Sequence, residues 1–584
     1  MVNTQTPSPH PFLQRVRPHG LYRFVPILET LRTYQLSWFG HDILAGLVIT
    51  AFLVPVGMAY AEAAGLPAIY GLYATIVPLL VYAIFGPGRI LFLGPDSALA
   101  AVIAATILPL AAGNADKAVA FAGILAIISG LLCIAAGLTK FGFITDLLSQ
   151  PIRYGYLNGI ALTVLIGQLP KFFGFSVSGS SFIQEANSLL QGIIYGKINW
   201  TSFSLGLFSV IVILGLKRRA PRLPGALIVM TAATIIVWLF NLSAAADISV
   251  VGTVPQGLPS FRISTFTLAE FSTLLAGAFA VALVSFADMS VLSRTFALRD
   301  GYENDTNHEI IALGAANVAT GLFQGFPISS SASRTTVAEA IGARTQITGI
   351  VGAVCIAFLL IFMPGLLQNM PASVLAAVVI CACILLFEVH GVMRLYKLRR
   401  DEFALSLVCF CGVVLLGVIT GIFIAVGLAL LAFIWRAWRP YYTVLGHVDG
   451  LQSYHDISRH PEAKQIPGLL LFRWDAPLFF ANAQTFREQI LLAVAKAPTQ
   501  IKWVVVTAEP VTDIDTTAAD VLIDIDKTLH QAGMDLFFAE MKGPVKDRLK
   551  QYGLMAKLGT DNFFQTIEQA VERYQTIHRT NGTK

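Results

Sequence analysis

Two short segments of this chain combine glycine and proline with hydroxyl and charged residues inside long apolar regions. The first runs from Gly86 to Ser97, and the second runs from Gly325 to Arg334. The apolar stretch that follows each segment is too short to span a bilayer as a helix. Irregular backbone is tolerated within a membrane only where it is buried in protein or lines a cavity. Two such interruptions at matching places of two halves indicate the central binding site of a transporter.

Each segment predicts a half-helix that begins near mid-membrane, one at about Asp96 and the other near Ser331. A helix N-terminus carries about half a positive charge and several N–H donors without a partner. Two such ends that face each other would hold an anion, as helix N-termini hold phosphates. The predicted substrate-binding residues are Asp96, Ser97 and Ala98 of the first half-helix and Ser331, Ala332, Ser333 and Arg334 of the second.

Arg334 lies one turn into the second predicted half-helix. A charged side chain at this depth is costly, so it must face protein or water. One interpretation is that Arg334 attracts the anion beside Ser331 and Ser333. The other is that it forms a fixed ion pair with an acid on a neighbouring helix, and the two can coexist.

Asp96 and Asp288 are the predicted coupling-ion residues. Asp96 could simply cap its half-helix. If it points into the site while ionised, it would repel a dianion, so it would be protonated, paired with Arg334 or bound to a cation. Asp288 lies deep in the apolar segment 270–298. It could take up a coupling proton, ligate Na⁺ together with Ser285, or form a permanent salt bridge.

The composition indicates a polytopic α-helical membrane protein. The chain has 584 residues, of which 55% are hydrophobic and 13% charged, and its mean hydropathy is +0.69. Soluble domains carry about 25% charged residues. A crossing needs about 20 apolar residues, which gives fourteen predicted transmembrane segments. They are 43–62, 65–86, 96–111, 118–138, 146–168, 203–217, 223–242, 270–298, 307–323, 331–343, 346–363, 371–388, 401–419 and 420–437, with a break at Thr420-Gly421.

The distribution of positive charge supports this arrangement with a cytoplasmic N-terminus. The predicted inside loops hold the clusters Lys217-Arg218-Arg219 and Arg399-Arg400, whereas the predicted outside loops hold single basic residues. This asymmetry follows the positive-inside rule. Fourteen segments divide into two inverted sevens, with the half-helices as segments 3 and 10. We therefore predict a 7+7 inverted repeat in the inner (plasma) membrane.

Several runs of residues resemble signatures of the SulP anion permeases. The run from Val54 to Ala61, with Ala64-Gly65-Leu66-Pro67, is similar to the first-helix signature of that family. Ser331-Ala332-Ser333-Arg334-Thr335, with Gly342-Ala343-Arg344-Thr345-Gln346, resembles its tenth-helix signature. The resemblance extends from about Leu36 to Tyr574. It implies a gate domain that moves against a core domain in a homodimer, and it adds Tyr60 to the substrate-binding residues.

Three positions depart from the pattern of the resembled family. Val56 stands where the family often has glutamine, which removes an amide from the substrate side. Asp288 is the acid of a segment in which the family commonly has glutamate, and Asp96 stands where many members have a neutral side chain. These departures concern the substrate and the coupling ion and leave the expected fold unchanged.

The C-terminal part predicts a small α/β domain, because buried strands alternate with helices. Strands are expected at 469–472, 503–506 and 536–538. This part resembles the STAS domain, in which the loop that holds Asp515 and Thr516 is a regulatory surface. The predicted domains are the cytoplasmic segment 1–40, the transport domain 41–438, the STAS domain 442–577, also cytoplasmic, and the tail 578–584.

The leading hypothesis is secondary active transport of an inorganic oxyanion, with sulfate first and H⁺ as the symported ion. Na⁺-coupled transport of bicarbonate and transport of a dicarboxylate are the alternatives within this class. An anion channel or a membrane sensor linked to the STAS domain are alternatives of another class. No residues support an enzyme, a nucleic-acid partner, a cofactor or a metal, and all six cysteines lie in apolar segments.

Overall fold

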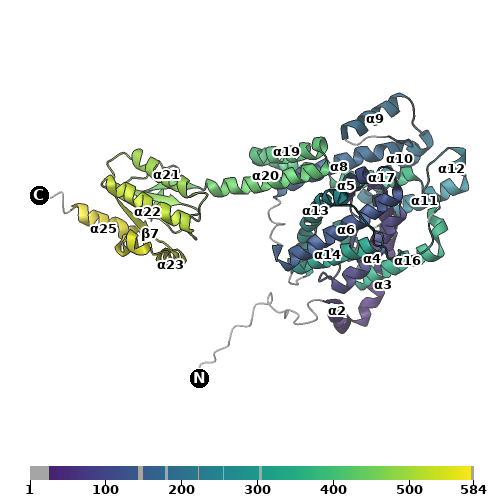
Figure 1. Ribbon diagram of the computed structural model, residues 1–584, viewed down its shortest axis with the longest axis horizontal. Coiled ribbons are helices and arrows are strands. Elements are labelled where there is room, and N and C mark those ends of the chain that lie inside the picture. Colours follow the sequence, from purple (N-terminus) through teal and green to yellow (C-terminus); the bar gives the residue numbers. More distant parts are fainter. Residues whose placement is uncertain are drawn as a thin grey trace, which may run out of the picture. The chain divides into compact units, whose positions relative to one another are not determined.

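The computed structural model describes residues 25–141, 149–177, 182–220, 223–253, 255–300, 305–451 and 453–579. The parts of the predicted N-terminal segment and tail at 1–24 and 580–584 lie outside the described residues. The chain divides into two compact units, Met1–Ala429 and Leu430–Lys584. The first unit is built almost entirely of helices, and the second is a sheet covered by helices (Figure 1).

Every predicted segment coincides with a helix, although many ends differ by several residues. Proline and glycine set many of these ends; Gly65, for example, has a φ of +78° and follows the end of α3. The helices are α2 (Ile27–Thr33), α3 (Leu36–Ala63), α4 (Ile69–Phe85), α5 (Ser97–Ala111), α6 (Ala115–Leu138), α8 (Gln150–Phe173), α9 (Phe182–Ile194), α10 (Trp200–Arg219), α11 (Gly225–Leu239), α12 (Leu242–Ala245), α13 (Leu268–Asp300), α14 (Thr306–Leu322), α15 (Ala332–Ile341), α16 (Ile347–Phe362), α17 (Ala372–Leu386), α18 (Val389–Leu398), α19 (Arg400–Leu416) and α20 (Val418–Trp438).

Six helices in the described part of the chain are long and apolar enough to cross a membrane. Four shorter apolar helices, α4, α5, α11 and α16, accompany them. The polytopic helical membrane architecture is therefore confirmed. The exact count of fourteen crossings stays a prediction.

Several features of the helical unit were not predicted, among them the short helices α2 and α12. The last apolar run breaks at Gly417, whose φ of +94° suits glycine, so the predicted break at Thr420-Gly421 is wrong and both residues lie within α20. Helices α9 and α18 lie between apolar segments and were missed. Neither buries more than two residues, as expected of helices at a membrane surface.

Backbone contacts between α6 and α14 fix the packing around the first half-helix. A Cβ added at Gly130 would lie 2.6 Å from the carbonyl oxygen of Gly314. A Cβ at Gly321 would collide with the carbonyl oxygen of Gly123. Small residues at matched positions allow such close approach of membrane helices. Helix α5 packs against both α6 and α13.

The second unit contains one six-stranded sheet in the order β4-β3-β5-β6-β7-β8. Strands β5 to β8 are parallel, and β3 is antiparallel to β4 and β5. The three predicted strands are confirmed as β5, β6 and β7. The elements are β3 (Tyr442–His447), β4 (Tyr454–Asp456), β5 (Leu469–Trp474), α21 (Ala483–Ala495), β6 (Trp503–Thr507), α22 (Thr516–Gln531), β7 (Asp535–Ala539), α23 (Gly543–Gln551), α24 (Met555–Leu558), β8 (Phe563–Phe564) and α25 (Ile567–Arg579).

Alternate residues of these strands bury two different cores. Val504 and Val506 of β6 belong to the cluster that includes residues of α21, α22 and α23. Trp503 and Val505 belong to a second cluster with residues of α25. The period of two along a strand sends successive side chains to opposite faces. Both faces of the sheet are thus covered by helices.

Candidate functional site

The two interrupted segments meet in a short antiparallel pair of strands. In β1 (Leu93–Gly94) and β2 (Ser329–Ser330), Leu93 pairs with Ser330 and Gly94 with Ser329. The N–H of Ser331 also donates to the carbonyl oxygen of Phe92 at 3.0 Å. The prediction that the starts of the two half-helices come together is therefore confirmed in this geometry.

Side chains from outside these segments bond several of their backbone groups. The Asn317 amide accepts from the N–H of Ile328 at 2.9 Å and donates to the carbonyl oxygen of Ile328 at 3.1 Å. The Gln346 amide donates to the carbonyl oxygens of Gly88 at 2.8 Å and Leu91 at 3.0 Å. Buried backbone groups must be paired, so these two amides hold the interruptions in the membrane interior.

The second half-helix, α15, begins with a neutral cap and an open first turn. Ser331 is its N-cap, and its hydroxyl accepts from the N–H of Arg334 at 3.5 Å. The hydroxyls of Ser331 and Ser333 lie 3.3 Å apart. Ala332 and Ser333 are exposed. The side chains of the first turn of α15 are therefore accessible.

Arg334 is buried, with 5% of its surface exposed. Its guanidinium donates to the carbonyl oxygen of Pro95. The guanidinium also lies against Gly94, where an added Cβ would be 2.5 Å from Nη1. Within the described residues, no ion pair joins Arg334 to a carboxylate. This buried cation thus keeps donors available, since a guanidinium has five N–H groups.

The first half-helix, α5, begins in a different way. Asp96 is its N-cap, and the carboxylate accepts from the N–H of Ala98 at 2.9 Å. Ser97 and Ala98 are both buried, whereas Asp96 is partly exposed. The capping role considered for Asp96 is thus present in the structure. The carboxylate also interacts electrostatically with Arg334 of the other half-helix.

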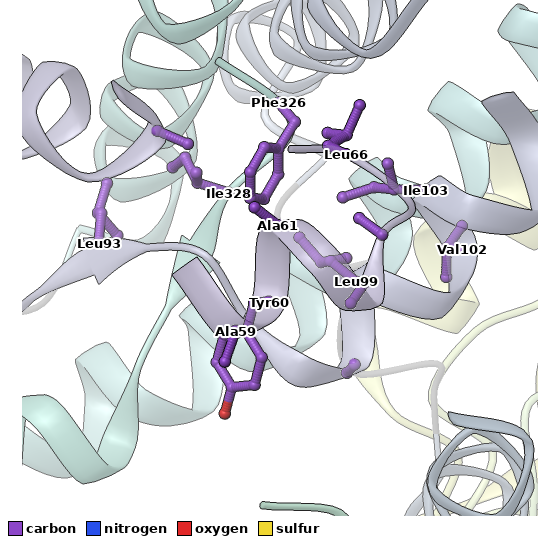
Figure 2. Close-up of a cluster of buried hydrophobic side chains, with 14 of the residues drawn as sticks. Ala59, Tyr60, Ala61, Leu66, Leu93, Leu99, Val102, Ile103, Phe326 and Ile328 are labelled. Carbon is purple, nitrogen blue, oxygen red and sulfur yellow. The ribbon is translucent and has the colours of Figure 1, made fainter. Parts of the chain in front are cut away.

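Tyr60 of α3 lies near the starts of both half-helices. Figure 2 shows its phenol oxygen pointing away from the apolar side chains around it, which include Leu99 and Ile328. The phenol interacts electrostatically with Asp96 and Arg334. The residues named from the sequence are therefore brought together, with an apolar cluster behind them.

Asp288 pairs with a residue that the sequence analysis did not name. The guanidinium of Arg153 on α8 donates to its carboxylate at 2.9 Å. The side chains are 29% exposed for Arg153 and 17% exposed for Asp288. Tyr156, one turn further along α8, interacts electrostatically with both members of the pair and with Asp96. Asp288 thus forms a salt bridge in the structure, as one of its three interpretations expected, and α8 supplies the basic partner.

Several buried hydroxyls near these elements have no hydrogen-bond partner among the residues that the structure describes. They lie on α13, β2 and α8, and α13 packs against β2. Buried polar groups are normally paired, so unpaired ones indicate a place where a solute, ion or water would bind. The hydroxyls are those of Ser285, Ser290, Ser329, Ser330 and Tyr156.

Asp42 is an acid of structural importance that the sequence analysis missed. It is fully buried and accepts from the N–H groups of Arg344 at 2.7 Å and Thr345 at 3.1 Å. The hydroxyls of Thr345 and Thr348 also donate to it, at 2.7 and 3.0 Å. Thr345 and Gln346 of the tenth-helix signature therefore bond α3 and the first interrupted segment. A lone acid at the start of the first apolar segment was the available signal.

A cavity lies away from the half-helix starts. Its volume is about 520 Å³, and its wall includes Glu62 of α3, Lys171 of α8 and Tyr70 of α4. Within the described part of the chain, no cluster of three or more His, Cys, Asp or Glu could hold a metal ion. The six cysteines are free and buried or partly buried.

The candidate regulatory loop of the second unit is ordered by its own side chains. Asp515 caps α22 by accepting from the N–H of Ala518 at 2.8 Å. Its other oxygen accepts from the N–H of Phe480 at 2.7 Å. Thr516 is the first residue of α22. The capping role expected for Asp515 is present, and its carboxylate also ties two loops together.

The chain is similar to known proteins along most of its length. The sulfate permease family model matches residues 39–409, and the STAS domain model matches residues 460–570. A Mycobacterium tuberculosis protein named probable sulfate transporter is 38% identical over 552 residues, which cover 94% of this chain and 98% of that protein. Solute carrier family 26 member 6 of Homo sapiens is 32% identical over 82% of this chain and 66% of its own length.

Solved structures share the fold. Murine solute carrier 26 family member A9, an anion transporter in the inward-facing state, has a TM-score of 0.89 at 21% identity over 97% of each chain. The transmembrane domain of a cyanobacterium bicarbonate transporter has a TM-score of 0.58 at 22% identity, over 68% of this chain and 98% of that one. The recognition made from the helix signatures is confirmed, and so is the expectation of a transporter that is not an enzyme. The chain belongs to the sulfate permease family of membrane anion transporters, with a C-terminal STAS domain.

Proposed function

We propose that this anion transporter carries sulfate by symport with H⁺, with alternating access around the starts of α5 and α15. The observation that carries this proposal is Arg334, which is buried and has a backbone carbonyl as its side-chain partner. Removing one partner of a buried ion pair is strongly destabilising. Arg334 has no ion pair among the described residues, although Asp96 acts on it electrostatically, so its guanidinium can gain from a bound anion.

The chemistry around Arg334 suits a tetrahedral oxyanion. Ser331 and Ser333 supply hydroxyls 3.3 Å apart, and the first turn of α15 supplies N–H groups. The exposed Ala332 and Ser333 give the solute access to them. Hydrogen bonds between a charged donor and an anion are about twice as strong as neutral ones. Tyr60, Ser97 and Ala98 would complete the site from α3 and α5.

Two acids could couple transport to protons. The Asp96 carboxylate faces the site and would repel sulfate unless it takes up a proton. Asp288 is held by Arg153, and uptake of a proton would release that arginine. We propose Asp96 as the acid that senses the substrate directly and Asp288 as the acid that links α13 to α8.

A second candidate is Na⁺-coupled transport of bicarbonate or a dicarboxylate. The unpartnered hydroxyls of Ser285 and Ser290 favour it, since Ser285 lies one helical turn before Asp288 on α13. Oxygen ligands are those that hard cations prefer. If Na⁺ bound at Asp288 in place of a proton, these two hydroxyls would act as further oxygen ligands.

Uptake of radiolabelled sulfate into proteoliposomes separates these functions. An inward proton gradient should drive accumulation above equilibrium, and a Na⁺ gradient alone should not. Accumulation driven by Na⁺ and blocked by bicarbonate or succinate would replace the first proposal with the second. Flux that never exceeds equilibrium would indicate a channel, and absence of flux of all three anions would favour the sensor.

The same proposal extends to the arrangement of the protein in the cell. We propose a homodimer in the plasma membrane, with the segment 1–40, the STAS domain at 442–577 and the tail 578–584 on the cytoplasmic side of the transport domain 41–438. Asp515 and Thr516 would then face cytoplasmic partners. Protease protection in right-side-out and inverted vesicles tests the orientation, and cross-linking in the membrane tests the dimer.

A further inference from the structure

Helix α8 carries a basic residue near each of its ends. Arg153 lies in its first turn and Lys171 near its last residue. This separation corresponds to about 27 Å along a helix, which is most of the ~30 Å of a hydrocarbon core. Arg153 pairs with Asp288 beside the candidate site, whereas Lys171 pairs with Glu62 of α3 at the other end.

The Lys171 ammonium holds the C-terminal end of α3 in two ways. It lies 3.2 Å from a carboxylate oxygen of Glu62 and donates to the carbonyl oxygen of the same residue at 3.3 Å. A cation at a helix C-terminus is also favoured by the helix dipole. The Glu62 side chain is 14% exposed and that of Lys171 is 39% exposed, so the pair is open to water on one side.

The same pair lines the 520 Å³ cavity, at the end of α3 that follows Tyr60. Glu62 follows Tyr60 by two residues on α3, and Tyr60 interacts with Asp96 and Arg334. Glu62 and Lys171 both line the 520 Å³ cavity, together with the turn after α3 that begins at Gly65. The turn of α3 beyond Tyr60 is therefore part of the cavity wall.

We propose that the Glu62–Lys171 ion pair is a gate contact that closes the route between this cavity and the anion site. The inference rests on the alternating access proposed above. It assigns the cavity as the entrance on the side opposite to the proposed cytoplasmic face. When the site opens toward the cavity, α3 and α8 move apart and this pair breaks.

The packing of the two helices agrees with such a movement. Helix α3 packs most extensively against α16 and α4, and α8 against α19 and α17, although α17 also packs against α3. Direct contact between α3 and α8 is small, so their polar link can break while each helix keeps its main neighbours. Partly exposed ion pairs are weak, at roughly 0.2–1 kcal/mol, which suits a contact that must open in every transport cycle.

Cysteine labelling tests the gate without depending on transport. Ala332→Cys places a reporter at the exposed start of α15, and Thr253→Cys, on the cavity wall, marks the side from which the cavity opens. A membrane-impermeant thiosulfonate is added from that side, and the protein without either reporter gives the background from the six native cysteines. We expect Glu62→Gln and Lys171→Gln to increase labelling of the Ala332→Cys reporter by about fivefold.

Matched variants decide between a gate contact and a general loss of structure. Lys171→Arg and the exchange of Glu62→Lys with Lys171→Glu should return labelling to within about twofold of the original rate. Lys197→Gln removes an exposed lysine elsewhere and should leave it unchanged. If the reporter were labelled at the same rate in Glu62→Gln, Lys171→Gln and Lys197→Gln, the proposal of a gate contact would be overturned. A change in labelling, together with no sulfate uptake by the protein that carries neither reporter, would retain the gate and reject sulfate as the solute.

Discussion

The two half-helices begin at paired strands, yet their first turns are chemically opposite. Helix α5 begins with a carboxylate cap, Asp96, and its next two residues are buried. Helix α15 begins with a neutral cap, Ser331, and its next two residues are exposed. The cation of the site, Arg334, belongs to α15. The two ends are therefore not equivalent halves of one anion trap.

This difference assigns distinct roles to the two ends. At α15 the helix dipole and the guanidinium both favour negative charge. At α5 the ionised carboxylate offsets the dipole, so this end attracts an anion only when Asp96 is protonated or its charge is balanced. Under the proposed symport, substrate binding at α15 and proton binding at α5 would be linked at the same place.

Loss of the α15 cation should have the largest effect. Arg334→Gln removes the buried charge while keeping a donor, and we expect the apparent affinity for sulfate to fall about 100-fold, since hydrogen bonds to charged groups contribute roughly 1.5–3 kcal/mol. Uptake is measured in proteoliposomes over a range of sulfate concentrations. Arg262→Gln, at an exposed position away from the site, is the control. Affinities that fall equally in both variants would contradict the comparison.

A displaced guanidinium tests whether position matters as well as charge. Gly94→Ala adds a Cβ that would lie 2.5 Å from Nη1 and 3.6 Å from Cζ of Arg334. The guanidinium must shift, and we expect it to weaken its bond to the Pro95 carbonyl and to lower the affinity about tenfold. Gly215→Ala adds a Cβ with nothing within 4 Å and should leave uptake unchanged. A normal affinity for Gly94→Ala would show that the charge alone suffices.

The sequence alone predicted the positions of the two half-helix starts. Glycine and proline inside apolar regions indicated both interruptions, and Asp96 and Ser331 were named as the half-helix starts that the structure shows. Such signals are local, because each depends on a few adjacent residues. The resemblance added Tyr60, whose approach to the site depends on how α3 packs.

The partners of the charged residues could not be predicted in the same way. Arg153 lies 135 positions from Asp288 and Asp42 lies 302 positions from Arg344. Nothing in the local sequence of either acid indicates which distant helix will face it. The gate pair of Glu62 and Lys171 was missed for the same reason, since each stands near a helix end, where a solvated role is the usual expectation.

Replacing the charged cap of α5 by a neutral one should make the starts of α5 and α15 alike in the charge of their caps. Asn caps a helix about as well as Asp, so Asp96→Asn removes the charge and keeps the start of α5. We expect sulfate affinity at neutral pH to rise about fivefold, because the repulsion between the carboxylate and the dianion is lost. The dependence of uptake on pH should flatten over the same range. An unchanged pH profile would leave capping as the role of Asp96 and transfer proton coupling to Asp288.

Loosening the α15 cap should have the smallest effect. Ser331→Ala removes the hydroxyl that accepts from the N–H of Arg334, and loss of such a cap costs about 1 kcal/mol. We expect about a threefold loss of sulfate affinity, because the backbone that carries Arg334 becomes less ordered while the guanidinium remains. Asn114→Ala removes a comparable cap from α6, where Asn114 accepts from the N–H of Lys117 at 3.0 Å. If both variants reduce affinity to the same extent, the loss reflects general helix stability. A loss confined to Ser331→Ala shows that the order of the α15 start itself determines how firmly the anion is held.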